Sequence, residues 1–203
     1  MDKKENWNDY DYVIQRVAED GRDLRFASEE LQKNKQIVLL AVAIDSDALE
    51  FASDELRKDL GFLKMAIAIN GFALKYLREE LRNNPEFVKI AVARYGRALK
   101  YASDDLRNHP EIVKVAVTQN GLALLYASDE LKNNKEIVLL AVAENGRALL
   151  YASDELKNDP EIFWKAIKQD PNCLKYAGKE IYDVYKSLGS QLLEAQLSKL
   201  FKF

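Results

Sequence analysis

An aromatic residue recurs every 25 positions along this chain, and the residues that follow it repeat as well. Ala-Ser-Asp-Glu-Leu or a close variant follows most copies of the aromatic residue. The aromatic positions are Phe26, Phe51, Tyr76, Tyr101, Tyr126, Tyr151 and Tyr176. An ungapped period of this length is typical of stacked supersecondary units that contact mainly their neighbours. The chain is therefore expected to fold as a tandem-repeat solenoid.

The copy at residues 126–150 shows the helix signals of one repeat most clearly. Ser128 and Asn134 are residues that cap helix N-termini, and each is expected to begin a helix. The second of these helices is predicted to run for about ten residues, to Glu144. Gly146 is expected to end it in the left-handed conformation that glycine adopts without penalty. Residues 147–152 then predict another short helix, α or 3₁₀, and no strand alternation occurs anywhere.

The ten-residue helix of that copy is apolar over a wide arc. An arc broader than a surface helix needs indicates contacts with a like helix on either side. Leu139 and Ala143 are expected on the opposite face. The residues expected to face inward are Ile137, Val138, Leu140, Ala141 and Val142.

The repeat pattern divides the chain into three parts. Residues 1–8 form a polar leader, 9–177 a single solenoid domain, and 178–203 a group of C-terminal capping helices. Complete units begin at residues 26, 51, 76, 101, 126 and 151. The last helix is predicted over 191–202, with Leu193, Leu197, Leu200 and Phe201 at helical spacing. It either shields the last repeat, as solenoid ends require, or serves dimerisation or partner binding.

The repeated frame resembles a known family. Asn-Asp-Pro-Glu-Ile-Val, Ala-Val-Ala-x-Asn-Gly-x-Ala-Leu and Tyr-Ala-Ser-Asp-Glu-Leu follow one another, and the resemblance covers about residues 10–177. They are similar to a tandem-repeat family catalogued as a domain of unknown function in amoeba-associated bacteria, such as the legionellae, and in giant viruses. The unit is also similar to the leucine-rich variant repeat, which alternates α and 3₁₀ helices. That second resemblance implies a right-handed α-solenoid of about seven units. Neither resemblance implies an activity.

Few residues of this chain suit catalysis or metal binding. His109 is its one histidine, and it occupies a helix-cap position that asparagine or aspartate fills in other copies. Cys173, the one cysteine, replaces a repeated alanine and is expected to be buried. Zinc sites need more such ligands, and no phosphate-binding glycine motif occurs. We expect neither enzyme activity nor a cofactor.

Two rows of basic residues invite comparison with nucleic-acid-binding repeats: Arg57, Arg82, Arg107, Lys132 and Lys157, and Lys64, Lys89 and Lys114. Both rows have acidic residues three positions away on the same predicted helices. The expected pairs are Asp54–Arg57, Asp104–Arg107, Glu86–Lys89 and Glu111–Lys114. Such pairs neutralise a phosphate-tracking surface, so nucleic-acid binding is the second hypothesis and not the first.

Composition places the chain in a reducing, aqueous compartment. A net charge of −3 gives little attraction to phosphate or anionic lipid. No apolar run has the roughly 18 residues of a membrane span. One cysteine excludes an internal disulfide. Cytoplasmic action is expected, and export without an N-terminal signal stays open.

One copy departs from the repeat pattern in several positions at once. It carries Arg94, Tyr95 and Arg97, and Phe72 lies just upstream in the preceding copy; these four residues are expected to be exposed and to lie together where the two copies meet. Aromatic and arginine residues are typical of protein-binding hot spots. We therefore expect a non-enzymatic scaffold that binds a protein through these residues, a host protein if the source is a pathogen or virus. The alternatives are a nucleic-acid-binding array and a structural module that self-associates through its C-terminal helix.

Overall fold

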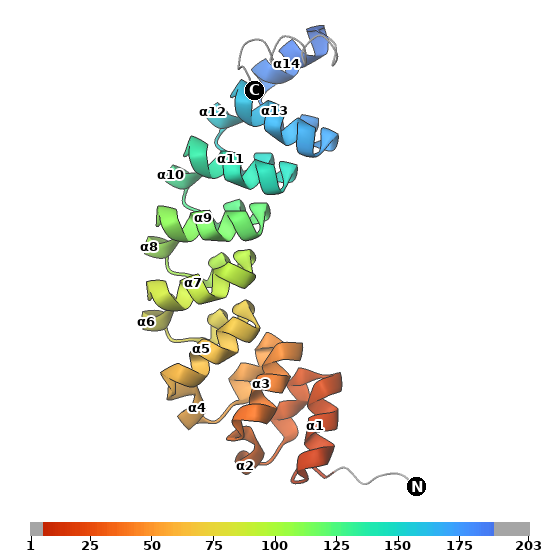
Figure 1. Ribbon diagram of the computed structural model, residues 1–203, viewed down its shortest axis with the longest axis vertical. Coiled ribbons are helices and arrows are strands. Elements are labelled where there is room, and N and C mark those ends of the chain that lie inside the picture. The colour runs from red at the N-terminus through yellow and green to blue at the C-terminus, as the bar shows by residue number, and fades with distance from the viewer. Residues whose placement is uncertain (1–5, 189–203) are drawn as a thin grey trace. The chain divides into compact units, whose positions relative to one another are not determined.

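The computed structural model describes residues 6–188, and every regular element in that part of the chain is a helix (Figure 1). It is an all-α repeat solenoid, as predicted. A C-terminal helix over 191–202 lies outside the described residues.

Each repeat contains three helices. The long α-helices are α1 (Tyr10–Glu19), α3 (Lys35–Ile44), α5 (Leu60–Ile69), α7 (Pro85–Arg94), α9 (Pro110–Gln119), α11 (Lys135–Glu144) and α13 (Pro160–Gln169). The 3₁₀ helices are η1 (Gly21–Phe26), η2 (Ser46–Phe51), η3 (Gly71–Tyr76), η4 (Gly96–Tyr101), η5 (Gly121–Tyr126), η6 (Gly146–Tyr151) and η7 (Pro171–Tyr176). The short α-helices are α2 (Glu29–Gln32), α4 (Asp54–Lys58), α6 (Glu79–Arg82), α8 (Asp104–Arg107), α10 (Asp129–Lys132) and α12 (Asp154–Lys157), followed by α14 (Lys179–Leu188).

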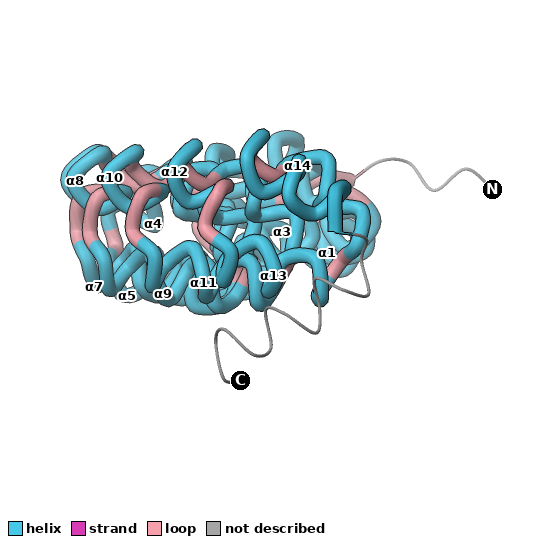
Figure 2. Tube along the Cα trace, turned by 90° about the horizontal axis from the view of Figure 1, so that it is seen from above, coloured by secondary structure: helices cyan, strands magenta, loops and turns pink. Residues whose placement is uncertain are grey.

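The helices gather into two compact units, Met1–Ser103 and Asp104–Phe203. In the second unit α9, α11 and α13 form one layer and α8, α10 and α12 form another (Figure 2). Long helices of successive copies contact each other within each unit, as α1 does α3 and α11 does α13. The predicted packing of each copy on its neighbours is therefore seen inside both units.

Apolar residues at the same four positions of each long helix from α3 to α13 form the core. In α11 these are Ile137, Val138, Ala141 and Val142, which are all fully buried. The prediction that Leu140 faces inward is wrong, because this residue is 37% exposed. The helix buries a narrower face than its composition suggests, and the remaining apolar residues lie on the surface.

Glycine begins most of the 3₁₀ helices because the next repeat approaches closely at that point. A Cβ on Gly146 would lie 2.6 Å from the carbonyl oxygen of Ala166 in the next long helix. The predicted left-handed conformation is wrong, since Gly146 has no positive φ in the range that favours glycine. Asn145 ends α11 instead, in extended conformation with φ −146°. The glycine provides space and not a special backbone angle.

Hydrogen bonds between short helices join the copies at the opposite edge. The Ser128 amide donates to the carbonyl of Arg107 at 3.0 Å, and Ser153 repeats this bond to Lys132 at 3.0 Å. The Ser128 hydroxyl also donates to Asn108 Oδ1 at 2.5 Å and accepts from the Leu131 amide at 3.2 Å. Each such serine therefore caps its own helix and binds the preceding copy.

Surface ion pairs also link copies. Glu86 pairs with Lys64 of the preceding copy at 2.7 Å, so the predicted Glu86–Lys89 pair is wrong. Lys114 contacts both Glu111 at 3.5 Å and Glu136 of the next copy at 2.9 Å. The pairs predicted inside short helices, Asp54–Arg57 and Asp104–Arg107, do form.

Both ends of the described chain continue the repeat contacts. The carbonyl of Trp7 accepts from the Ser28 amide at 3.0 Å, and its ring lies 5.1 Å from that of Phe26. At the other end Asn158 Oδ1 accepts from two amides at the start of α14. Tyr185 of α14 packs its ring 5.6 Å from Phe163. Trp7 thus makes the same backbone contact to Ser28 that Gln32 makes to Ser53 one copy later.

Replacing Gly146 with alanine should lower the free energy of unfolding by about 1–3 kcal/mol, because the added methyl group meets a backbone carbonyl. Gly61→Ala is the control. Its added Cβ meets only the flexible Asp59 carboxylate at 3.3 Å, so this change should be neutral or stabilising by up to about 1 kcal/mol. Urea unfolding followed by circular dichroism measures both. Equal effects would contradict the close-approach explanation.

Candidate functional site

The four residues singled out from the sequence lie along one edge of the first unit, where long helices end and 3₁₀ helices begin. Phe72 is the second residue of η3 and Arg97 the second residue of η4. Arg94 ends α7, and Tyr95 connects α7 to η4. Because successive 3₁₀ helices contact each other, residues from two copies meet here.

Three aromatic rings form a cluster at this edge. The ring centroids of Phe72 and Tyr95 are 5.7 Å apart, and that of Tyr101 lies 6.4 Å from Phe72, edge to face. Arg94 lies over the Tyr95 ring at 5.9 Å and Lys100 over the Tyr101 ring at 5.4 Å. Sequence reasoning missed Tyr101 and Lys100. Tyr101 belongs to the repeated aromatic row, so nothing marked it as different from its counterparts.

The expected exposure of these side chains is only partly correct. Arg94 and Arg97 are exposed, but Phe72 and Tyr95 are half-buried. The Tyr95 hydroxyl donates to the carbonyl of Ile69 at 2.9 Å, and its ring lies against Gly71. The rings pack against the preceding copy and against each other, which removes part of their surface from water.

Tyr95 stands where the other copies form a tight polar turn. There an asparagine or aspartate side chain accepts from the amide two residues later, as Asn70 does from Phe72 at 3.2 Å and Asn145 from Arg147 at 3.0 Å. Tyr95 makes no such bond. Losing a cap of this kind costs about 1 kcal/mol. The chain therefore replaces a stabilising turn with an aromatic contact in this copy alone.

The contact between α4 and the next copy also differs from its counterparts. In the part of the chain that the structure describes, the Arg78 amide makes no bond to the carbonyl of Arg57, although Ser53 and Ser103 make the equivalent bonds. Arg78 also replaces the serine of the Ser–Asn pair, and Lys58 replaces the asparagine. Two cations cannot form the Ser–Asn hydrogen bond. The copies that contain α4 and α6 are connected by the Lys64–Glu86 ion pair and by the bond from the Tyr95 hydroxyl to the Ile69 carbonyl.

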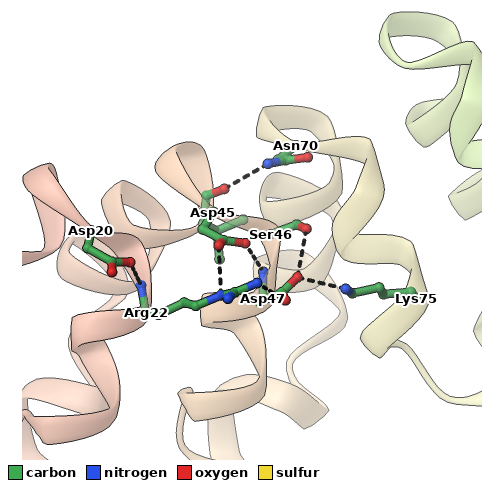
Figure 3. A network of polar contacts seen from close by, with 8 residues as sticks. Asp20, Arg22, Asp45, Ser46, Asp47, Asn70 and Lys75 are labelled. Atoms are coloured by element: carbon green, nitrogen blue, oxygen red, sulfur yellow. Dashed lines mark hydrogen bonds and ion pairs between the residues drawn. The ribbon is translucent and has the colours of Figure 1, made fainter.

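A charged network that includes Lys75 of η3 connects the preceding copies (Figure 3). Arg22 contacts Asp45 at 2.9 Å and Asp47 at 2.6 Å, and Lys75 contacts Asp47 at 2.7 Å. The Asp47 side chain is 23% exposed, so solvent screens these pairs only in part. The network links η1, η2 and η3 of three successive copies.

The network shifts the ionisation of its members. The hydrogen bond from Lys75 lowers the pKa of Asp47 to about 2, and the same bond raises the pKa of Lys75. Burial raises the pKa of Tyr76 beside them. All three groups therefore keep their present charges at neutral pH.

The two residues considered for catalysis lie elsewhere. His109 precedes α9 and is exposed, and its side chain makes no cap bond. Cys173 is fully buried, and burial raises the pKa of its thiol to about 11. Within residues 6–188 no three His, Cys, Asp or Glu side chains are grouped to hold a metal ion. The same residues include no helix long and apolar enough to cross a membrane.

The regular succession of long, 3₁₀ and short helices defines a tandem helical repeat protein. A family model described as Domain of unknown function (DUF4116) matches the chain at residues 9–57, 59–107, 85–132, 109–157 and 134–182. The chain belongs to this family. No curated protein and no solved structure matches it. The similarity to the leucine-rich variant repeat, and the right-handedness that it implies, stay predictions.

Replacing Asp47 with asparagine should lower the free energy of unfolding by about 1–2 kcal/mol at neutral pH. The pKa of Asp47 is lower in the folded chain than in the unfolded one, so its carboxylate stabilises the fold above about pH 4. That contribution is lost as the pH falls towards about 2. The difference in free energy of unfolding between wild type and Asp47→Asn should become smaller over the same pH range.

Urea unfolding of both proteins across this pH range measures the effect. Asp129→Asn is the control, because the Asp129 side chain is 98% exposed and its pair with Lys132 is solvated. A wild-type advantage over Asp47→Asn that persists undiminished at low pH would show that the charge of Asp47 is not its source.

Proposed function

We propose that this chain is a non-enzymatic repeat scaffold that binds a protein partner through the edge formed by Phe72, Arg94, Tyr95 and Arg97. The observation that carries the proposal is the contact between these unusual residues. Phe72, Tyr95 and Arg94 depart from the repeat pattern and touch one another across two copies. Aromatic and arginine side chains supply most of the binding energy in many protein interfaces.

The fold itself does not require these side chains. The copy at residues 101–125 holds Leu122, Gln119 and Asn120 at the equivalent positions, and the same three helices form there. Tyr95 even removes a stabilising turn. A change that costs stability and is not needed for folding is typical of a functional surface.

Absence of enzyme activity is part of the proposal. The acidic pairs recur at the start of nearly every short helix, where they favour the positive end of the helix dipole. The raised pKa of Cys173 disfavours the reactive thiolate, and burial blocks access to it. We also propose action in the cytoplasm, which the lone, unpaired cysteine supports, and a host protein as partner if the source is a pathogen or virus.

The test uses the residues that other copies carry at the same positions. A variant with Phe72→Leu, Arg94→Gln and Tyr95→Asn should fold normally, because Leu122, Gln119 and Asn120 already occupy the equivalent positions in the copy at residues 101–125. We expect its melting temperature to stay within about 4 °C of wild type. Affinity capture with mass spectrometry should identify a protein that binds wild type, and the purified pair should bind directly. The variant should bind that partner at least about tenfold more weakly than wild type does.

Arg147→Leu is the matched control, since Arg147 occupies the same position in the repeat as Phe72 and the described part of the chain has no aromatic cluster beside it. This control should bind the partner as wild type does. Capture that disappears on nuclease treatment would favour the nucleic-acid hypothesis instead. Light scattering that shows a stable dimer and no other partner would favour self-association.

A further inference from the structure

Two cations at the aromatic edge have ring partners but no acidic partner. Arg94 lies over Tyr95 and Lys100 over Tyr101, and both cations are exposed. Within residues 6–188 neither of them contacts a carboxylate. By contrast, Arg22 and Lys75 on the neighbouring copies pair with aspartates.

The charge along this edge is therefore uneven. The network around Asp47 contains two cations and two carboxylates in mutual contact, so it is close to neutral. Beside it, Arg94 and Lys100 add positive charge without local compensation. A cation over a ring is held in place but keeps its charge available, because the ring supplies only a weak quadrupole attraction.

Apolar surface lies on the other side of the cluster. Ile44 ends α3 and is 50% exposed, and Ile69 holds the same position at the end of α5, where it is half-buried. Phe72 adds part of its ring to this surface. The edge thus presents apolar side chains beside uncompensated cations.

We infer that the edge binds an acidic protein segment that carries apolar side chains between its carboxylates. The inference rests on the proposed function and specifies the chemistry of the partner. The carboxylates of the segment pair with Arg94 and Lys100, while its apolar side chains contact Ile44, Ile69 and Phe72. Opposite charge at an interface increases both association rate and selectivity.

The same geometry is less suited to single-stranded nucleic acid. Bases stack on open ring faces. Here Arg94 covers a face of Tyr95, Lys100 covers a face of Tyr101, and Phe72 packs against both rings. The rings hold the cations in place and are not open platforms for bases.

Fluorescence anisotropy with the full chain and three labelled probes tests the inference. The probes are a peptide of alternating glutamate and leucine or phenylalanine, the same peptide with glutamine for glutamate, and an oligothymidylate. The acidic peptide should bind at least about tenfold more tightly than either of the others. Raising the sodium chloride concentration from about 50 to about 300 mM should weaken binding of the acidic peptide several-fold.

Charge reversal locates the site. The double variant Arg94→Glu and Lys100→Glu should bind the acidic peptide at least about tenfold more weakly than wild type does. Its circular dichroism spectrum should be that of wild type. The control Lys165→Glu and Lys168→Glu, which reverses two exposed cations of α13, should have little effect. Equal binding of the glutamine peptide, tighter binding of the oligothymidylate, or equal effects of the two double variants would overturn the inference.

The failure of this inference can be told from failure of the proposed function. A captured partner that requires Phe72 and Tyr95 but tolerates the charge reversal and high salt would leave the proposed function intact and show that the partner segment is not acidic. If no protein depends on this edge in either experiment, both proposals are wrong.

Discussion

The close approach of one backbone to the next determines how the repeats stack. The 3₁₀ helices that begin at Gly21, Gly71, Gly121 and Gly146 lie against a carbonyl near the end of the following long helix, where a Cβ on Gly21 or Gly121 would lie 2.3 or 2.2 Å from an oxygen. Such a contact tolerates no side chain, so it sets the separation and register of neighbouring copies. The buried rows of the core and the serine bonds at the far edge both depend on that register.

Two successive joints depart from this arrangement, the first of them between the copies that contain α3 and α5. Ser46 occupies the glycine position, and a Cβ there requires more separation from the next helix. At this joint Lys75 pairs with Asp47, which also pairs with Arg22 of the copy before. At the next joint, between the copies that contain α5 and α7, the bond between Arg78 and Arg57 is missing from the described residues, and two cations replace the Ser–Asn pair. Charge pairs thus replace close backbone packing where the repeat pattern is weakest.

The candidate site could be predicted only in part. Tyr95 and its neighbour Arg94 were recognisable because Tyr95 replaces an asparagine or aspartate that the other copies keep. Phe72 was recognisable as the one aromatic residue at a position that varies between copies. Tyr101 and Lys100 were not, since an aromatic residue follows a lysine in other copies too, as in Lys75–Tyr76. What distinguishes Tyr101 is a neighbour, Phe72, that comes from another repeat. A pattern read along one chain does not contain that contact.

By itself, the sequence determined the class of fold, the period and the caps that begin each helix, because local propensity and periodic apolar residues decide these. Ser128 and Asn134 do cap helices, and Ile137 and Val138 are buried. Only the tertiary structure decided why glycine is required, which apolar residues stay on the surface, and how far the rings of Phe72 and Tyr95 are buried. Those outcomes depend on the distance between neighbouring copies, which is set by packing and not by the properties of one repeat.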